Sequence, residues 1–452
     1  MKKLYFVLSR VFEILKTHKR GWIITLIGGG IFMISYFHRV NIAAFSNYLM
    51  IDIKISASSL GILASSYFYI YGFEQIISGT LSDVIKPKRL IVFSGILMAI
   101  GSFLFYFALS LNIAFLGRIL IGVGAGFSFV PLLKIVATWF DKNKFSTVVG
   151  FITVLGNLGA LLATVPFVIL INLVGWRFSF LIIGVVTLVL SFLSLFFIEC
   201  GPYTFDSMGI DLEGSIAEVS QNRSNYLVKP NFFKTLKSGI IVWISNSGFI
   251  LLGLISFFTY GTLMSFQGLW ISPLLLHIYK IPPEGIGGWL VIIVSGSILG
   301  RLLAGHITNR FLNRNKKLGI IVGSIMYGFI WFLIFYFINS IFLTILKILF
   351  FLLGISTSII VINYLSLIRD FAPKENYGTI AGINNLFPFL GTTVFQIFIG
   401  YILENTSFFN IKITEASIKV YKDIFGIYFL TSLFIILLSL LLLNKNSFKK
   451  SE

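Results

Sequence analysis

Apolar residues fall into long uninterrupted runs along this chain, and short charged segments separate one run from the next. Each run is close to the roughly 20 residues that an α-helix needs to cross a hydrocarbon layer of about 30 Å. The runs lie near residues 22–50, 58–81, 89–110, 112–136, 146–172 and 177–198, and then near 247–275, 285–307, 318–338, 341–366, 378–403 and 424–443. The pattern predicts an all-α polytopic membrane protein with twelve transmembrane helices.

The runs form two groups of six on either side of one long polar segment. The first twenty residues are rich in lysine and arginine, and no small-residue cleavage site follows the first apolar run, which argues against a cleaved signal peptide. We therefore expect a cytoplasmic tail over 1–20, a six-helix bundle over 21–198, a linker over 199–246, a second six-helix bundle over 247–444 and a cytoplasmic tail over 445–452.

Composition excludes a water-soluble fold. Of the 452 residues, 57% are hydrophobic and 12% are charged, whereas soluble domains average roughly a quarter charged residues. The net charge of +18 comes from basic residues in alternate loops, such as Lys88 and Arg89, so we relate it to orientation in the bilayer and expect no nucleic-acid partner. This asymmetry predicts that both termini and the linker face the cytoplasm, and that the protein lies in the plasma (inner) membrane. Cys200 is the only cysteine, which excludes an intrachain disulfide.

Two short segments recur at nearly the same offset, half a chain apart. The segment from Gly79 to Asp83 is echoed in the second half by the segment from Gly305 to Asn309, and the segment 147–150 is echoed by 379–382. These echoes predict two pseudo-symmetric six-helix bundles with a central cavity, an arrangement suited to alternating access.

Several motifs occur in order and at matching places in this topology: Gly79-x-Leu81-Ser82-Asp83 after the second run, Arg118 with Gly122 and Gly124 in the fourth, and Gly175-Trp176-Arg177 before the sixth. In these motifs the sequence resembles the major facilitator superfamily over almost its full length. The resemblance implies a secondary transporter of that fold, and it implies gating roles for six residues: Gly79, Asp83, Arg89, Arg118, Asn309 and Arg310.

Within that family, the segment from Tyr36 to Asn41, which contains Arg39, is similar to the organophosphate:phosphate antiporter and sugar-phosphate permease branch, as are Tyr71-Gly-Phe and Trp139-Phe140. The resemblance implies that Arg39 binds the anionic group of the substrate. The sequence departs from the branch at Met264 and Gly156, where a second arginine and a histidine would fall.

Ionisable residues inside the membrane are costly and need a partner, water or a function. Arg39 is too deep in the first run to reach water easily, so it either contacts a ligand or forms a structural pair with Glu74. Glu74 in turn either carries a coupled proton or serves that ion pair. Arg301 and Lys347 are interpreted as structural or lumen-facing. Further candidates for a substrate site are polar or aromatic residues in other runs: Tyr36, Gln75, Gln267, Trp270, Asn384 and Lys134.

The sequence therefore favours a secondary active transporter that moves a small polar, anionic metabolite, such as an organic or sugar-phosphate-like anion, by alternating access. Its partners would be the solute, the lipid bilayer, and protons or a counter-substrate. The alternatives are a proton-coupled carrier of neutral or zwitterionic nutrients such as dipeptides or sugars and, more remotely, a transporter-like receptor or a membrane enzyme. The sequence has no nucleotide-binding, zinc-protease or CxxC motif, so we expect no cofactor, no metal and no enzyme activity.

Overall fold

The computed structural model describes residues 2–140, 142–199, 232–313, 315–338, 340–373, 376–405 and 415–443. Within these ranges it leaves undescribed the side chains of residues 2–18, 75–76, 79–80, 82–84, 142–147, 232–235, 283–284, 309, 377–378 and 415–418. Over the described residues the structure consists of helices and short connections, and it contains no strand. The predicted tail over 445–452 and most of the predicted linker fall outside these residues.

The first half of the chain forms α1 (Lys2–Val40), α2 (Ile42–Ile53), α3 (Ala57–Val84), α4 (Pro87–Tyr106), α5 (Leu111–Gly126), α6 (Phe129–Trp139), α7 (Lys142–Leu162) and α8 (Val165–Phe197). The second half forms α10 (Phe232–Ser245), α11 (Ser247–Ser265), the π-helical segment η1 (Phe266–Trp270), α12 (Ile271–His277), α13 (Pro283–Phe311), α14 (Lys316–Phe337), α15 (Leu343–Phe371), α16 (Tyr377–Asn405) and α17 (Glu415–Leu441).

The helices confirm the prediction of a twelve-span membrane fold. Ten segments in the described part of the chain are long and apolar enough to cross a bilayer. The remaining two are α3 and the path that runs through α7 into the start of α8. That path ends at Gly175, whose φ of 80° interrupts α8 and separates the fifth span from the sixth. Glycine adopts this left-handed conformation without the steric cost that a side chain would add.

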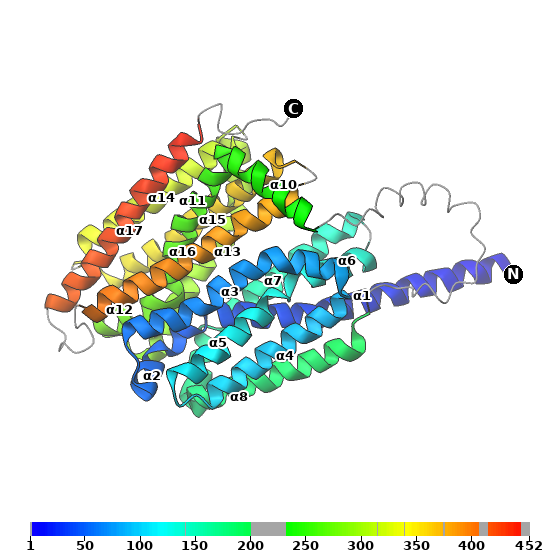
Figure 1. Cartoon of the computed structure of the whole chain (residues 1–452), viewed down its shortest axis with the longest axis horizontal. Helices are drawn as coiled ribbons and strands as arrows, with labels where there is room; N and C mark the ends of the chain where they lie inside the picture. The colour runs from blue at the N-terminus through cyan, green and yellow to red at the C-terminus, as the bar shows by residue number, and fades with distance from the viewer. Residues whose placement is uncertain are drawn as a thin grey trace.

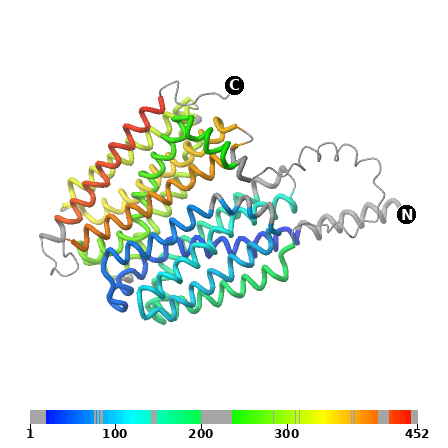
Figure 2. Tube along the Cα trace, viewed as in Figure 1, coloured from blue at the N-terminus to red at the C-terminus, as the bar shows by residue number. Residues whose placement is uncertain are grey.

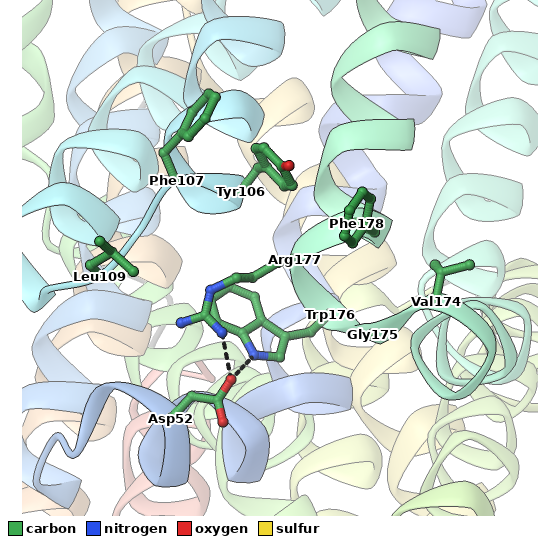
Figure 3. A pocket seen from close by; sticks show the side chains of 9 residues that line it. All are labelled: Asp52, Tyr106, Phe107, Leu109, Val174, Gly175, Trp176, Arg177 and Phe178. Atoms are coloured by element: carbon green, nitrogen blue, oxygen red, sulfur yellow. Dashed lines mark hydrogen bonds and ion pairs between the residues drawn. The ribbon is translucent and has the colours of Figure 1, made fainter.

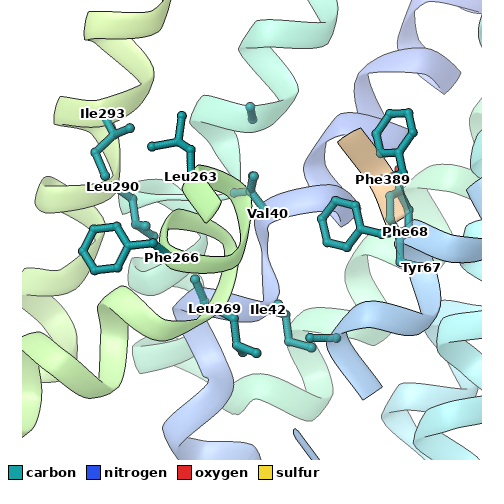
Figure 4. Close-up of a cluster of buried hydrophobic side chains, with 14 of the residues drawn as sticks. Val40, Ile42, Tyr67, Phe68, Leu263, Phe266, Leu269, Leu290, Ile293 and Phe389 are labelled. Atoms are coloured by element: carbon teal, nitrogen blue, oxygen red, sulfur yellow. The ribbon is translucent and has the colours of Figure 1, made fainter. Parts of the chain in front are cut away.

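The two halves lie side by side as separate groups of helices (Figure 1). The tube in Figure 2 shows the first half, in blue to teal, along one side of the second half, in green to red. Helices α2 and α12 lie together at one end of the molecule, which we call the α2 end, and α10 lies toward the opposite end, the α10 end. Buried apolar side chains from both halves pack at the centre, including Val40 and Phe68 from one half and Leu263 and Phe389 from the other (Figure 4).

Helix breaks follow the repeat that the sequence predicts. The first span is interrupted after Val40, at Asn41, and the seventh changes to π-helix at Phe266. The offset that relates Asp83 to Asn309 also relates Val40 to Phe266. π-Helical turns inside α-helices are frequent at functional sites. Equivalent spans of the two halves therefore carry an irregular turn at equivalent positions.

Glycines allow the halves to touch at symmetry-related points near the α2 end. A Cβ built on Gly61 of α3 would lie 2.6 Å from the carbonyl oxygen of Gln396 in α16, and one built on Gly287 of α13 would lie 2.7 Å from the Cα of Val165. In the repeat, Gly287 is the equivalent of Gly61, and Gln396 is the equivalent of Thr164, the neighbour of Val165. The repeat found in the sequence thus relates the contacts between the halves.

Candidate functional site

A small cavity lies between the two halves near the irregular turns of the first and seventh spans. Its volume is about 50 Å³, which is room for roughly four water molecules. Its described lining comes from α1, α7, α11, η1 and α13, and consists of Tyr36, Arg39, Val40, Asn157, Ala160, Tyr260, Met264, Gln267, Val294, Ser297, Ile298 and Arg301. Both halves contribute, as expected of a site that alternating access exposes to each side in turn.

Arg39 is the buried charge of this cavity. It lies in the last turn of α1, next to the break, and only 5% of its surface is exposed. Its guanidinium carbon lies 4.2 Å from the ring centre of Tyr36, 4.7 Å from that of Tyr71 and 5.4 Å from that of Phe389. These aromatic faces attract the cation by about 0.5–2 kcal/mol each, but they accept no strong hydrogen bond.

Two donor atoms of Arg39 therefore remain without an acceptor. Its Nε and Nη2 are buried and make no hydrogen bond within the described part of the protein. A buried charged group without hydrogen-bond partners is energetically costly. An arginine held at a cavity in this way is suited to a carboxylate, sulfonate or phosphate, each of which accepts two parallel hydrogen bonds from a guanidinium.

Glu74 does not neutralise Arg39 in this structure. It lies buried in α3, and neither of its carboxyl oxygens has a hydrogen-bond partner among the described residues. Its carboxyl group occupies the space beside Gly126, at the end of α5, where any larger residue would collide with it. The ion pair considered as an alternative role for both residues is thus absent from this conformation.

Arg118 supports the segment that carries Arg39. Its Nη1 donates to the backbone oxygen of His38 at 2.7 Å and to Oδ1 of Asn41 at 3.4 Å, and its guanidinium lies 4.9 Å from the ring centre of Tyr67. His38 also contacts Ser102 through Nε2 at 3.2 Å. Arg118, which the resemblance assigns to gating, is therefore a buried residue that braces the break between α1 and α2.

Arg301, which the sequence analysis interpreted as structural or lumen-facing and did not select as a substrate contact, lines the cavity. It projects from α13 of the second half, is half-buried, and donates from Nη1 to Oδ1 of Asn157 in α7 at 3.2 Å. A lone arginine inside an apolar span is a functional candidate by default, and that signal was present. The apolar residues of α13 show only a weak helical periodicity, so the sequence did not indicate which face of the helix turns toward the cavity.

The other predicted site residues are only partly brought together. Gln267 lines the cavity with its Oε1 unpaired within the described residues. Trp270 and Asn384 are buried but are not among the described lining residues, and half-buried Lys134 in α6 is not among them either. The side chains of four predicted residues lie outside the described set: Gln75, Gly79, Asp83 and Asn309. Arg89 and Arg310 are exposed, at the start of α4 and the end of α13.

A larger hollow of about 470 Å³ lies at the α2 end, on the first half alone (Figure 3). Its charges already pair with each other, because Asp52 accepts hydrogen bonds from Nε1 of Trp176 at 2.7 Å and from Nη1 of Arg177 at 2.6 Å. Arg177 also donates to the backbone oxygen of Ala108 at 3.3 Å. This cluster ties α2 to α8 and gives the Gly175-Trp176-Arg177 motif a structural role, so the smaller central cavity is the candidate site.

Comparison with known proteins identifies the family of the chain. A family model described as "Major Facilitator Superfamily" matches residues 27–396. "Probable sulfoacetate transporter SauU" of Cupriavidus necator is 25% identical over 171 residues, which is 38% of this chain and 40% of that protein, so the chain matches less than two thirds of its length. The "Glycerol-3-phosphate transporter" of Bacillus subtilis is 23% identical over 389 residues, which is 82% of this chain and 83% of that protein.

The fold is also found among solved structures. A bacterial homologue of the human lysosomal transporter Spinster, in an inward-facing and unoccupied conformation, superposes with a TM-score of 0.73 at 13% identity, covering 94% of this chain and 97% of that one. Since the family model spans most of the sequence and the helices adopt this fold, the chain is an integral membrane protein that belongs to the Major Facilitator Superfamily of transporters.

Proposed function

We propose that the protein is a secondary transporter that carries a small organic anion through the cavity between its halves, with Arg39 as the principal anion contact. The observation that carries this proposal is the pair of buried, unpaired donor atoms of Arg39 at the cavity. Tyr36 and Gln267 line the same space and would orient the solute. The named solutes of the two relatives, sulfoacetate and glycerol 3-phosphate, are both anions, which supports the same class.

Coupling and orientation belong to the same proposal. Transport would be coupled to a proton carried by Glu74, since its carboxyl group is buried and unpaired within the described residues. Alternatively, transport would be coupled to the exchange of a second anion. The protein would lie in the plasma (inner) membrane, with both termini and the linker facing the cytoplasm. The gate at the α10 end would then use the predicted residues at the ends of α3, α4 and α13, which are Gly79, Asp83, Arg89, Asn309 and Arg310.

One observation favours a second candidate, a proton-coupled carrier of neutral or zwitterionic nutrients. Glu74 is buried and has no hydrogen-bond partner among the described residues, so its carboxyl group could carry a proton that drives uptake of a solute with no net negative charge.

Binding and transport measurements separate the two candidates. Purified protein is screened by thermal shift against organic acids, sugar phosphates, amino acids, dipeptides and sugars, and the best solutes are then tested for uptake into proteoliposomes. The anion proposal expects stabilisation and uptake of acids or phosphates, and loss of both in Arg39→Gln. Stabilisation by dipeptides or sugars alone, unaffected by Arg39→Gln, would instead establish the second candidate.

A further inference from the structure

We infer that Arg301 is a second anion-binding residue, and that the cavity selects anions carrying two negative charges over anions carrying one. This inference rests on the proposed function and narrows its substrate class. It follows from the composition and charge of the cavity, from what holds each arginine in place, and from the halves to which the two arginines belong.

The cavity holds two cationic side chains and no counter-charge among its described lining residues. Arg39 reaches it from α1 and Arg301 from α13, and the other ten described residues that line it are uncharged at neutral pH. Like charges brought near one another in a poorly hydrated space repel, and each loses hydration that neutral neighbours replace only in part. A single monoanion would offset one of these charges and leave the other uncompensated.

Neutral groups hold both arginines in position. The guanidinium of Arg39 lies against the rings of Tyr36 and Tyr71. Arg301 is held by the amide oxygen of Asn157 at 3.2 Å. Neither contact cancels a full charge, so both cations are oriented while remaining available to an anion. Donor groups that are already held in place lose little further conformational entropy when the ligand binds.

The two arginines belong to different halves of the protein. An anion that binds both would bridge α1 and α13, and would favour the conformation in which the halves are close around it. A ligand shifts a conformational equilibrium only by its differential affinity for the two states. A doubly charged anion would gain more from closure than a monoanion, because it can contact both Arg39 and Arg301 where the two line one cavity, as they do in this structure.

Two ligand chemistries meet this requirement, and matched probes distinguish them. Succinate carries two carboxylates and butyrate has the same four carbons with one. Methyl phosphate at pH 8 carries two negative charges on one phosphate group, and dimethyl phosphate is the matched compound that carries one. The dissociation constant of each probe is measured by calorimetry on the full-length purified protein. We expect the doubly charged member of at least one pair to bind tenfold or more tightly, and the pair that shows this identifies the source of the charge.

The variants then assign the preference to Arg301. In Arg301→Gln the ratio of the two dissociation constants within the selective pair should fall to about threefold or less. The affinity for the monoanion should change little. Arg301→Lys should keep part of the preference, since it keeps the charge. Arg369→Gln is the matched control, because Arg369 is an exposed arginine of the same half, and its ratio should equal that of the wild type.

A second variant keeps the test decisive if Arg301→Gln does not fold. Asn157→Asp places a carboxylate beside Arg301 and should remove the preference in the same way, whereas Asn157→Ala should retain most of it. An unchanged ratio in Arg301→Gln or Asn157→Asp overturns the role of Arg301 but leaves the anion proposal standing. If no anion binds the wild-type protein, the proposed function fails and this inference fails with it.

Discussion

Arg39 combines a full charge, deep burial and, within the described part of the chain, two unpaired donors at the cavity between the halves. Lysine would keep the charge, but its ammonium group cannot form the two parallel hydrogen bonds that a guanidinium forms with a carboxylate or phosphate. We expect Arg39→Lys to weaken binding of the transported anion tenfold or more, a loss of about 1.4 kcal/mol or more. Arg39→Gln should nearly abolish transport in proteoliposomes while the protein is still produced and folded.

Glu74 provides the control for this interpretation. If Arg39 served mainly to neutralise Glu74 in another conformation, removing both charges together would restore what each single change removes. We expect the opposite, so that Arg39→Gln combined with Glu74→Gln stays inactive in the uptake assay. Activity regained by the double variant would move Arg39 from substrate contact to structural pair.

Glu74 alone should affect coupling more than substrate affinity. Glutamine keeps the size and polarity of the side chain and removes its ability to exchange a proton. If Glu74 carries the coupled proton, Glu74→Gln should abolish uptake driven by a pH gradient while counterflow of preloaded substrate continues. Gradient-driven uptake equal to that of the wild type would exclude Glu74 as the proton carrier.

Sequence reasoning selected Arg39 and Glu74 because a charged residue inside a long apolar run is easily recognised in a sequence. It did not find Asn157 as the partner of Arg301, since a neutral asparagine in a span resembles many packing residues and the two lie 144 positions apart. Trp270 was selected from the sequence but does not line the described cavity. Its place in the polar segment of the seventh span suggested a cavity wall, but the turn of η1 leaves it 1% exposed and away from the described lining of the cavity.

At the scale of helices, the spans were predictable and their internal breaks were not. Length and hydropathy located the twelve spans because bilayer thickness sets the number of apolar residues that each one needs. No proline lies near the break at Asn41, whereas the π-helical turn at Phe266–Trp270 lies just before Pro273, which has no N–H to bond to the carbonyl of Leu269. A proline indicates a disturbed turn but not its type, so the π-helical form of this turn could not be predicted from the local pattern.

Close helix contacts between the halves yield a prediction for closure at the α2 end. A Cβ on Gly287 would collide with the backbone of Val165, whereas Gly288, the next residue of α13, has open space around its Cβ position. We expect Gly287→Val to hold the two halves apart at the α2 end, which would slow transport while binding from that side is retained. Gly288→Val is the matched control and should transport normally.

Distances between spin labels on the α2 ends of α3 and α16 would measure this effect directly. Gly61→Val should shift the distance distribution toward longer values in the same way as Gly287→Val, because the two contacts are related by the repeat. A distribution unchanged in both valine variants would show that these contacts do not control closure.

At the scale of the whole molecule, two hydrogen bonds in the described part of the chain join the halves at the α2 end, and neither is an ion pair. Nδ2 of Asn47 in α2 donates to Oγ of Ser272 in α12 at 3.1 Å, and the backbone amide of Ser58 donates to Oε2 of Glu404 at 3.1 Å. Single hydrogen bonds of this kind contribute only about 0.5–3 kcal/mol each. These two hydrogen bonds are therefore a small part of a contact that also includes the close backbone approaches at Gly61 and Gly287.

The orientation of this assembly in the membrane rests on the distribution of lysine and arginine, and it can be tested with single cysteines. In a Cys200→Ser background, cysteines at Ser220 in the linker and Ser447 in the C-terminal tail should resist an impermeant thiol reagent in intact cells. Leu109 is 82% exposed and lines the hollow at the α2 end, so Leu109→Cys should react readily and serves as the positive control. Permeabilised cells should expose all three positions, which excludes burial as the cause of protection. Labelling at Ser220→Cys and Ser447→Cys in intact cells, with Leu109→Cys protected, would require the inverted orientation and would assign the α2 end to the cytoplasm.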